Sequence, residues 1–167
     1  MTTTTSKRFR CNHAYIDGAN LHKGAESLGW QIDYKKFYVW LKDKYRIKRA
    51  YIFMGYRPGF GKMYARMREA GFLVRFKEVI VTPDGKIKGN CDTDMAVRSV
   101  QDVYESVFDQ AIIVSSDGDF YSLVEYLREK DKIASVLSPY NNCSTLLVKI
   151  GVPVTYLNDF KDLISFI

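Results

Sequence analysis

The sequence has few of the residues that disulfide-stabilised and zinc-stabilised proteins need. It contains three cysteines (Cys11, Cys91 and Cys143) and two histidines in 167 residues. The cysteines are far apart, odd in number and include no Cys-x-x-Cys pair, which argues against a disulfide framework and a structural zinc site. We therefore expect a reducing, cytoplasmic environment.

Other signals are also missing. No apolar run is long enough to cross a bilayer, so we expect no membrane partner. The first ten residues are rich in threonine and then basic, and they do not resemble a secretory signal. No Gly-x-Gly-x-x-Gly turn is present, which argues against a dinucleotide-binding oxidoreductase. We expect residues 1–12 to form a flexible tail and residues 13–167 one domain with a single core.

The composition is that of a folded, basic protein. Hydrophobic residues make up 47% of the chain, and 25 Lys and Arg against 19 Asp and Glu give a net charge of +6. Several of the aspartates are candidates for one site, so the remaining surface should be more basic than this total indicates. Such a surface attracts polyanions and suits a nucleic-acid partner, although a mildly basic protein without one is the simpler alternative.

Apolar strand-like runs alternate with helical patterns along the chain. Strands are predicted at 14–16, 49–55, 72–81, 111–115, 133–137 and 152–157, and residues 86–88 look like the returning arm of a hairpin. Between them, an apolar stripe predicts a helix from residue 92 to about 107, and residues 141–150 also read as helix. This alternation predicts an α/β fold, with a mainly parallel central sheet and helices on both faces.

Five aspartates lie where such a sheet would gather them. Asp17 ends the first strand, Asp117 and Asp119 follow the strand at 111–115, and Asp92 and Asp94 open a helix. In open parallel sheets the functional crevice lies beyond the carboxyl ends of the strands. Carboxylates that meet there repel one another unless a cation compensates, and oxygen ligands suit Mg²⁺ or Mn²⁺. The alternative is that each aspartate only caps its local helix.

Polar and small residues accompany these acids. Gly18 would leave room beside Asp17 for a phosphate to approach the backbone. Asn20 lies three residues after Asp17, so on a first helical turn its amide would face the same cleft and orient phosphate or water. Ser115 and Ser116 could do the same from the end of the neighbouring strand. A turn or capping role for Asn20 is an equally good interpretation.

A basic, aromatic stretch follows the second strand. Arg57, Lys62 and Arg66 lie in and after a glycine-rich loop that also carries tyrosine and phenylalanine. Arginines hold phosphates and aromatic rings stack on unpaired bases, so this stretch could bind single-stranded nucleic acid. Lys88 lies close before Asp92 and could neutralise a scissile phosphate. An ordinary helix with a solvated basic face remains the alternative for residues 61–70.

Three motifs together resemble a known family. Tyr-Ile-Asp-Gly-Ala-Asn-Leu at 15–21, Lys-Gly-Asn-Cys-Asp-Thr-Asp at 88–94 and Val-Ser-Ser-Asp-Gly-Asp-Phe at 114–120 are similar to the NYN domain, in the LabA/DUF88 branch of the PIN-like nuclease superfamily. The resemblance covers the chain from about residue 13 to the end. It implies a three-layer PIN-like fold, a pocket that holds Mg²⁺ or Mn²⁺, and cleavage of RNA phosphodiesters.

The resemblance also implies roles for individual residues. Asp17 matches the aspartate of the family's first strand, and Asn20 matches its nearby asparagine. Asp92 matches the aspartate of the lysine- and glycine-containing segment, while Asp117 and Asp119 match the acidic pair after the fourth strand. The chain departs from the commonest pattern in two places, because Ser116 replaces a glycine and Asn-Cys precedes Asp92 at 90–91. Neither departure removes a carboxylate.

The sequence thus favours a metal-dependent ribonuclease. Its expected catalytic residues are Asp17, Asp92, Asp117 and Asp119, with Asp94 as an additional metal ligand, and its expected partner is single-stranded RNA. The main alternative is a non-catalytic RNA-binding adaptor on the same scaffold. A phosphatase is less favoured because no Asp-x-Asp follows the first strand. Assembly into a homo-oligomer is left open.

Overall fold

A computed structural model describes residues 10–77, 80–88 and 91–166 of the chain. Its centre is a sheet of six strands that all run parallel, in the order β3-β2-β1-β6-β7-β8. The strands are β1 (Asn12–Asp17), β2 (Ile47–Gly55), β3 (Leu73–Lys77), β6 (Ala111–Val114), β7 (Ile133–Ser138) and β8 (Val154–Tyr156).

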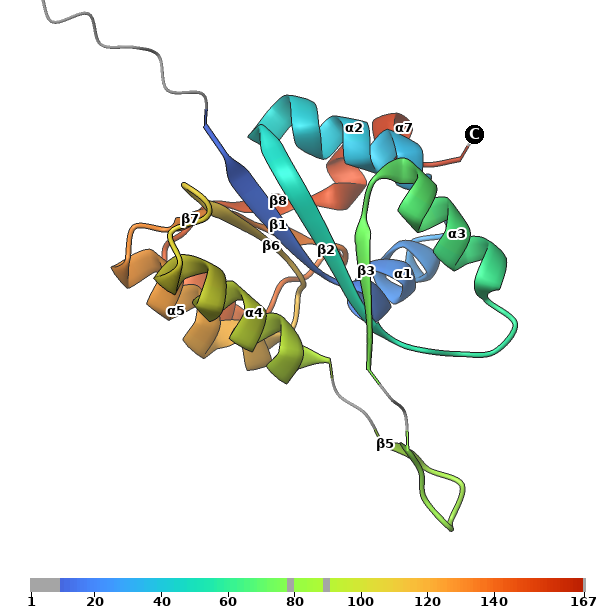
Figure 1. Cartoon of the computed structure of the whole chain (residues 1–167). Coiled ribbons are helices and arrows are strands. Elements are labelled where there is room, and N and C mark those ends of the chain that lie inside the picture. Colours follow the sequence, from blue (N-terminus) through green and yellow to red (C-terminus); the bar gives the residue numbers. More distant parts are fainter. Residues whose placement is uncertain (1–9, 78–79, 89–90, 167) are drawn as a thin grey trace, which may run out of the picture.

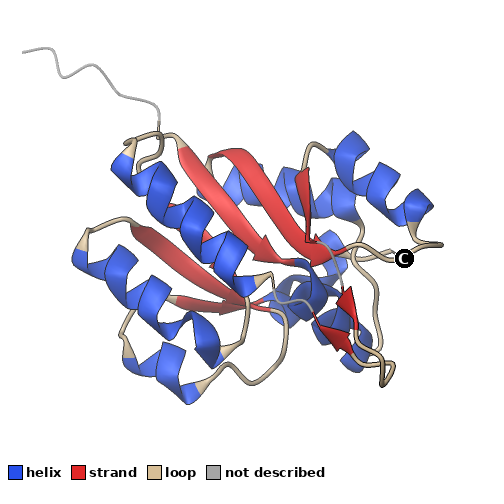
Figure 2. Cartoon of the chain, turned by 60° about the horizontal axis from the view of Figure 1, so that its bottom comes forward, coloured by secondary structure: helices blue, strands red, loops and turns tan. Residues whose placement is uncertain are grey.

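Helices cover both faces of this sheet (Figures 1 and 2). One face carries α1 (Gly18–Ser27), α2 (Tyr34–Tyr45), α3 (Gly61–Ala70) and α7 (Lys161–Ile164). The other carries α4 (Asp92–Tyr104), α5 (Tyr121–Glu129) and α6 (Thr145–Lys149). Two 3₁₀ turns, η1 (Gly118–Phe120) and η2 (Leu157–Phe160), complete the described elements. The predicted three-layer α/β architecture is confirmed.

The sheet separates two apolar cores, and successive side chains of each central strand contribute to them alternately. In β1, Ala14 and Ile16 pack into the core beneath α1 and α2, whereas Tyr15 packs into the core beneath α4 and α5. In β6, Ile112 and Ile113 divide between the same two cores. Side chains of a strand point alternately to opposite faces, so a strand buried on both sides is apolar throughout.

The strand order places a crevice between β1 and β6. The chain builds β1, β2 and β3 outward in one direction and then returns through α4 to β6, on the other side of β1. Neighbouring connections therefore leave from opposite faces of the sheet at this point, and ligands of open α/β sheets bind at such a switch in strand order. Ile16 of β1 pairs with Val114 of β6, so Asp17 and Ser115 lie beside each other at its mouth.

Helix α4 packs on the sheet with a largely polar face. The buried residues of the helix are Met95, Ser99 and Asp102, spaced four and three apart. Of the apolar residues whose spacing indicated this helix (Met95, Val97, Val100, Val103, Tyr104 and Val107), Met95 is buried, Val103 is half-buried and the other four are exposed. The polar face turns inward because the sheet offers it hydrogen bonds: the Tyr15 hydroxyl donates to Asp102 at 2.6 Å.

Two predicted elements are shorter in the structure. The run at 72–81 divides into β3 and the short strand β4 (Ile80–Val81), which pairs antiparallel with β5 (Ile87–Lys88). The hairpin expected at 86–88 is therefore confirmed, and Gly85 closes its turn with a φ of +78°. The predicted helix at 141–150 is reduced to α6, which begins after Ser144 because that side chain caps it.

The first described residues are tied to the sheet. The Cys11 backbone N–H donates to the Asp109 carboxylate at 2.8 Å, and the Asn12 side chain donates to the Tyr45 carbonyl at 2.6 Å. These two residues, which the sequence assigned to a tail, thus hydrogen-bond to the fold, while residues 1–9 lie outside the described part. The three cysteines are free. None of the described helices combines the length and apolar character that a bilayer crossing requires.

Candidate active site

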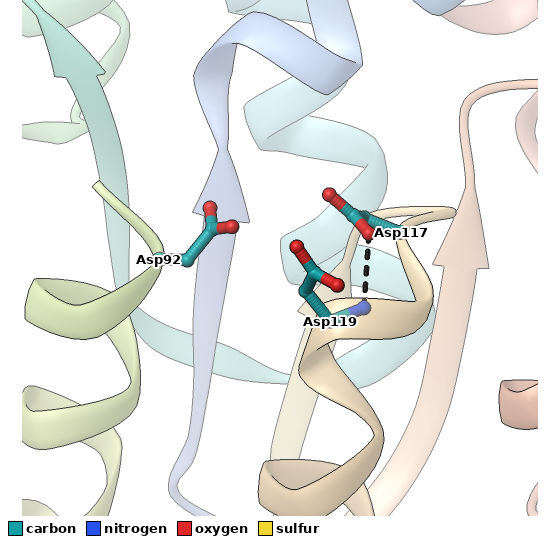
Figure 3. A group of neighbouring side chains, drawn as sticks. All are labelled: Asp92, Asp117 and Asp119. Atoms are coloured by element: carbon teal, nitrogen blue, oxygen red, sulfur yellow. Dashed lines mark hydrogen bonds between the residues drawn. The ribbon is translucent and has the colours of Figure 1, made fainter. Parts of the chain in front are cut away.

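Three carboxylates meet at the crevice (Figure 3). Asp92, Asp117 and Asp119 each offer an oxygen atom, and these atoms lie within 4.8 Å of one another. Asp92 comes from the first turn of α4, whereas the other two come from the loop and 3₁₀ turn after β6. Asp117 caps that turn, because its carboxylate accepts the Asp119 backbone N–H at 2.9 Å. Asp117 is therefore both the cap of this turn and one of the three clustered carboxylates.

Asp17 lines the same cleft, which has a volume of about 810 Å³. One of its carboxylate oxygens accepts the Asn20 backbone N–H at 3.1 Å, and the other accepts the Ser115 hydroxyl at 3.3 Å. Burial raises the pKa of Asp17 to about 6, and the charges of Asp92 and Asp117 add to this rise while the hydrogen bonds oppose it. The site thus holds an anion that the fold disfavours without a compensating cation.

This raised pKa predicts a pH-dependent stability. A carboxyl whose pKa is higher in the folded state than in the unfolded state stabilises the fold only while it is protonated. Its contribution is lost as the pH rises from the unfolded pKa to about 6, so the metal-free protein should lose about 2 kcal/mol from Asp17 between pH 4 and pH 7. The Asp17→Asn variant carries no charge there, and the Asn oxygen can still accept the Asn20 N–H.

Urea unfolding in EDTA at several pH values measures this effect. The difference in unfolding free energy, variant minus wild type, should grow by a few kcal/mol from pH 4 to pH 7. Addition of Mn²⁺ at pH 7 should then stabilise the wild type more than the variant. A difference that stays constant across this range would show that Asp17 is as acidic in the fold as in the unfolded chain.

Glycines beside the acids serve packing rather than ligand access. A Cβ atom at Gly18 would lie 2.9 Å from the Ile52 side chain and 3.1 Å from the Phe53 carbonyl oxygen, so the residue lets α1 approach β2. This replaces the expected reason, room for a phosphate. At Gly118 a Cβ atom would lie 2.5 Å from the Ser144 hydroxyl oxygen. The loop between Asp117 and Asp119 is therefore pressed against the start of α6.

The predicted polar residues form a network that fixes the loop after β6. Asn20 accepts the Ser116 backbone N–H at 2.9 Å through its side-chain oxygen. The buried Ser115 hydroxyl bridges Asp17 and the Asp117 N–H, to which it lies at 3.1 Å. The Ser116 hydroxyl lies 3.0 Å from that of Ser138. These contacts hold the acids of β1 and β6 in a fixed relation.

Other predicted residues lie apart from the acids. Asp94 lines a separate hollow of about 320 Å³ next to the cleft rather than joining the three carboxylates. Arg57 lines the cleft, whereas Lys62 and Arg66 are exposed on α3 and do not line it. The side chain of Lys88 lies outside the described part of the chain.

The cleft also contains residues that the sequence analysis did not assign. His22 and Lys23 of α1 line it, as do Tyr140 and Cys91. Lys23 lies three residues beyond Asn20, so the spacing that selected Asn20 could have selected it too. No local pattern marks Tyr140, because its position follows from the approach of the loop after β7 to Ser116. Burial and the nearby Asp17 raise the pKa of the Cys91 thiol to about 11, so this thiol is protonated at neutral pH.

Comparisons with known proteins agree with this geometry. The crystal structure of a Vibrio parahaemolyticus protein of unknown function has the same fold, with a TM-score of 0.80 and 22% sequence identity over 96% of this chain and 99% of that one. No curated protein matches the chain. The family model of the NYN domain matches residues 14–150, which include most of β1, all of α4 and β6, and the four aspartates that line the cleft. The chain therefore belongs to the NYN domain family, on a PIN-like α/β fold that generally carries nucleases.

Proposed function

We propose that this protein is a metal-dependent ribonuclease of the LabA/DUF88 branch that hydrolyses phosphodiester bonds of single-stranded RNA. The observation that carries the proposal is the meeting of Asp92, Asp117 and Asp119 within 4.8 Å at the switch in strand order. Membership of the NYN family supports nuclease chemistry, and the net charge of +6 supports a polyanionic substrate.

The donor set fits a hard divalent cation. All of the candidate ligands are carboxylate oxygens, which Mg²⁺ and Mn²⁺ prefer over nitrogen or sulfur. Among the described residues, no lysine or arginine forms a salt bridge with Asp117 or Asp119, so protein cations do not neutralise these two acids. Asp17 would complete the group from the end of β1. A bound cation supplies Lewis acidity, by lowering the pKa of a coordinated water and stabilising charge on phosphate oxygens.

The remaining residues of the site have assigned tasks in this proposal. Ser115 and Ser116 position the acids through the hydrogen bonds described above rather than through contact with RNA. Asn20 has its carbonyl committed to Ser116, and its amide nitrogen, which has no hydrogen-bond partner among the described residues, is left to contact a phosphate. Arg57 and Lys23 lie on the wall of the cleft, where they would hold the strand.

Cleavage assays test the proposal directly. Labelled single-stranded and double-stranded RNA are incubated with the protein in Mn²⁺, Mg²⁺ or EDTA, beside the Asp17→Asn variant. We expect metal-dependent cleavage of the single-stranded RNA by the wild type and none by the variant, whose fold is checked by circular dichroism. RNA binding without turnover in either metal, weakened by salt, would support the adaptor alternative instead.

A further inference from the structure

A second hollow adjoins the acidic cleft on the α4 side of the sheet. It has a volume of about 320 Å³, and Phe53 and Cys91 line both this hollow and the cleft, so the two spaces meet at these residues. The hollow exists because β3 is the edge strand. Helix α3 packs against β3 (Figure 1), and Val74 and Phe76 of β3 contact the core on that side. Leu73 and Arg75 alternate with them along the strand and are exposed.

Two arginines gather over one aromatic ring beside this hollow. The guanidinium carbons of Arg75 and Arg98 lie 5.8 and 5.3 Å from the centre of the Tyr51 ring. Two contacts fix the position of Arg98. Its Nη2 donates to the Tyr51 hydroxyl at 3.3 Å, and its Nε lies 3.2 Å from the buried Asp102 carboxylate. Arg98 nevertheless keeps 37% of its side chain exposed.

The charge of Arg75 has no such compensation. Among the described residues, no carboxylate forms a salt bridge with Arg75, and Asp94, which also lines the hollow, pairs with neither arginine. Two cations on one ring repel each other unless an anion approaches both. Arginine donors in a fixed plane favour phosphate in particular, because the guanidinium presents two parallel N–H groups to its oxygens.

The rest of the hollow suits a nucleoside. Phe53 and the half-exposed Val97 of α4 contribute apolar surface to its lining, and the Gln101 amide offers a donor and an acceptor. Its volume is near the lower end for small-molecule sites, which span roughly 300–1,000 Å³. This space suits one nucleotide and is too small for a duplex.

We propose that this hollow binds the nucleotide adjacent to the scissile phosphate, with Arg75 and Arg98 holding its phosphate and Phe53 and Val97 contacting the nucleoside. The proposal rests on the proposed ribonuclease function, because the acidic cleft defines the scissile position. It gives the RNA a defined path, from the carboxylates past Cys91 and along the open face of β3.

Charge reversal at Arg75 tests this site against a matched control. Arg75→Glu and Arg128→Glu change the net charge equally, but Arg128 lies exposed in the last turn of α5, outside both cavities. The substrates are a single-stranded RNA ten-mer and bis(p-nitrophenyl) phosphate, a diester without flanking nucleotides, both in Mn²⁺. We expect Arg75→Glu to raise KM for the ten-mer at least about tenfold and to leave hydrolysis of the small diester unchanged.

Two further variants test whether the change in KM is specific to the hollow or follows from any loss of positive charge. Arg128→Glu should change KM for the ten-mer less than about threefold. The milder Arg75→Gln should fold like the wild type in thermal unfolding and still raise KM. Equal losses on both substrates, equal effects of the two Glu variants, or no effect of Arg75→Glu would each overturn the proposal.

Binding measurements distinguish failure of the hollow from failure of the nuclease function. If the wild type hydrolyses neither substrate, the ribonuclease proposal fails. Fluorescence anisotropy with the labelled ten-mer then tests whether the hollow binds RNA. Binding by the wild type that Arg75→Glu weakens and Arg128→Glu does not would support the site. Absence of RNA binding, or equal binding by all three proteins, would reject it.

Discussion

The Asp92→Asn variant is expected to lose about 1000-fold in the kcat of RNA cleavage with Mn²⁺, because loss of a residue that merely orients a metal ligand already costs about 10- to 100-fold. The substituted amide would keep the shape of the side chain but lack the charge that, in the proposed function, would hold a cation beside Asp117 and Asp119. The measurement is single-turnover cleavage of labelled single-stranded RNA at saturating protein.

The neighbouring aspartate provides a matched control. Asp94→Asn removes the same charge from the same first turn of α4, so any effect of the helix dipole is shared by both variants. We expect Asp94→Asn to keep kcat within about threefold of the wild type, because Asp94 is not among the three converging carboxylates. Equal losses in the two variants would mean that the charge of the helical turn, rather than coordination by Asp92, governs the rate.

Removal of the buried carboxylate of α4 is expected to have the largest effect on stability. Asp102 is 1% exposed, accepts the Tyr15 hydroxyl at 2.6 Å and pairs with Arg98 at 3.2 Å. Burial lowers the pKa of His13, so this histidine is neutral at pH 7 and its 3.7 Å approach to Asp102 is not an ion pair. Asp102→Ala would leave the buried Tyr15 hydroxyl without its acceptor, which costs about 1–3 kcal/mol, and the partly exposed Arg98 without its partner. The unfolding free energy should therefore fall by about 3 kcal/mol.

Chemical denaturation of three variants measures this contribution. Asp102→Asn keeps an acceptor for the Tyr15 hydroxyl and should lose less than Asp102→Ala. Glu105→Ala, an exposed acid just after the same helix, should stay within about 0.5 kcal/mol of the wild type. A loss below about 1 kcal/mol for Asp102→Ala would show that the polar inner face of α4 is not what anchors it to the sheet.

Local patterns were sufficient to predict the layers of this protein. Strands buried on both faces are apolar throughout, helices separate them, and this alternation permits little other than a parallel sheet. The positions of Asp17 and Asp117 at strand ends then follow, because all strands of such a sheet end at the same edge. These parts of the fold depend on the period of the sequence and on the order of its elements, both of which are visible without coordinates.

Helix α4 shows where local patterns stop being informative. Apolar residues at helical spacing indicated that this helix exists, but two of them, Val97 and Val100, are 50% and 39% exposed in the structure. The helix turns Ser99 and Asp102 inward because the Tyr15 hydroxyl and the Arg98 guanidinium satisfy the Asp102 carboxylate there. Burial of a polar side chain depends on hydrogen-bond partners that are distant in the sequence, and hydrophobic periodicity does not reveal those partners.

The order of residues along the chain was enough to predict that aspartates gather at one edge of a parallel sheet. Which of them share one cluster depends on how the elements pack in three dimensions. Asp92 and Asp94 are two residues apart on a helix, so they point in different directions, and the rotation of α4 against the sheet selects between them. That rotation, like the hollow beside Arg75, is set by contacts among α4, β1 and β2, which are brought together only when the sheet forms.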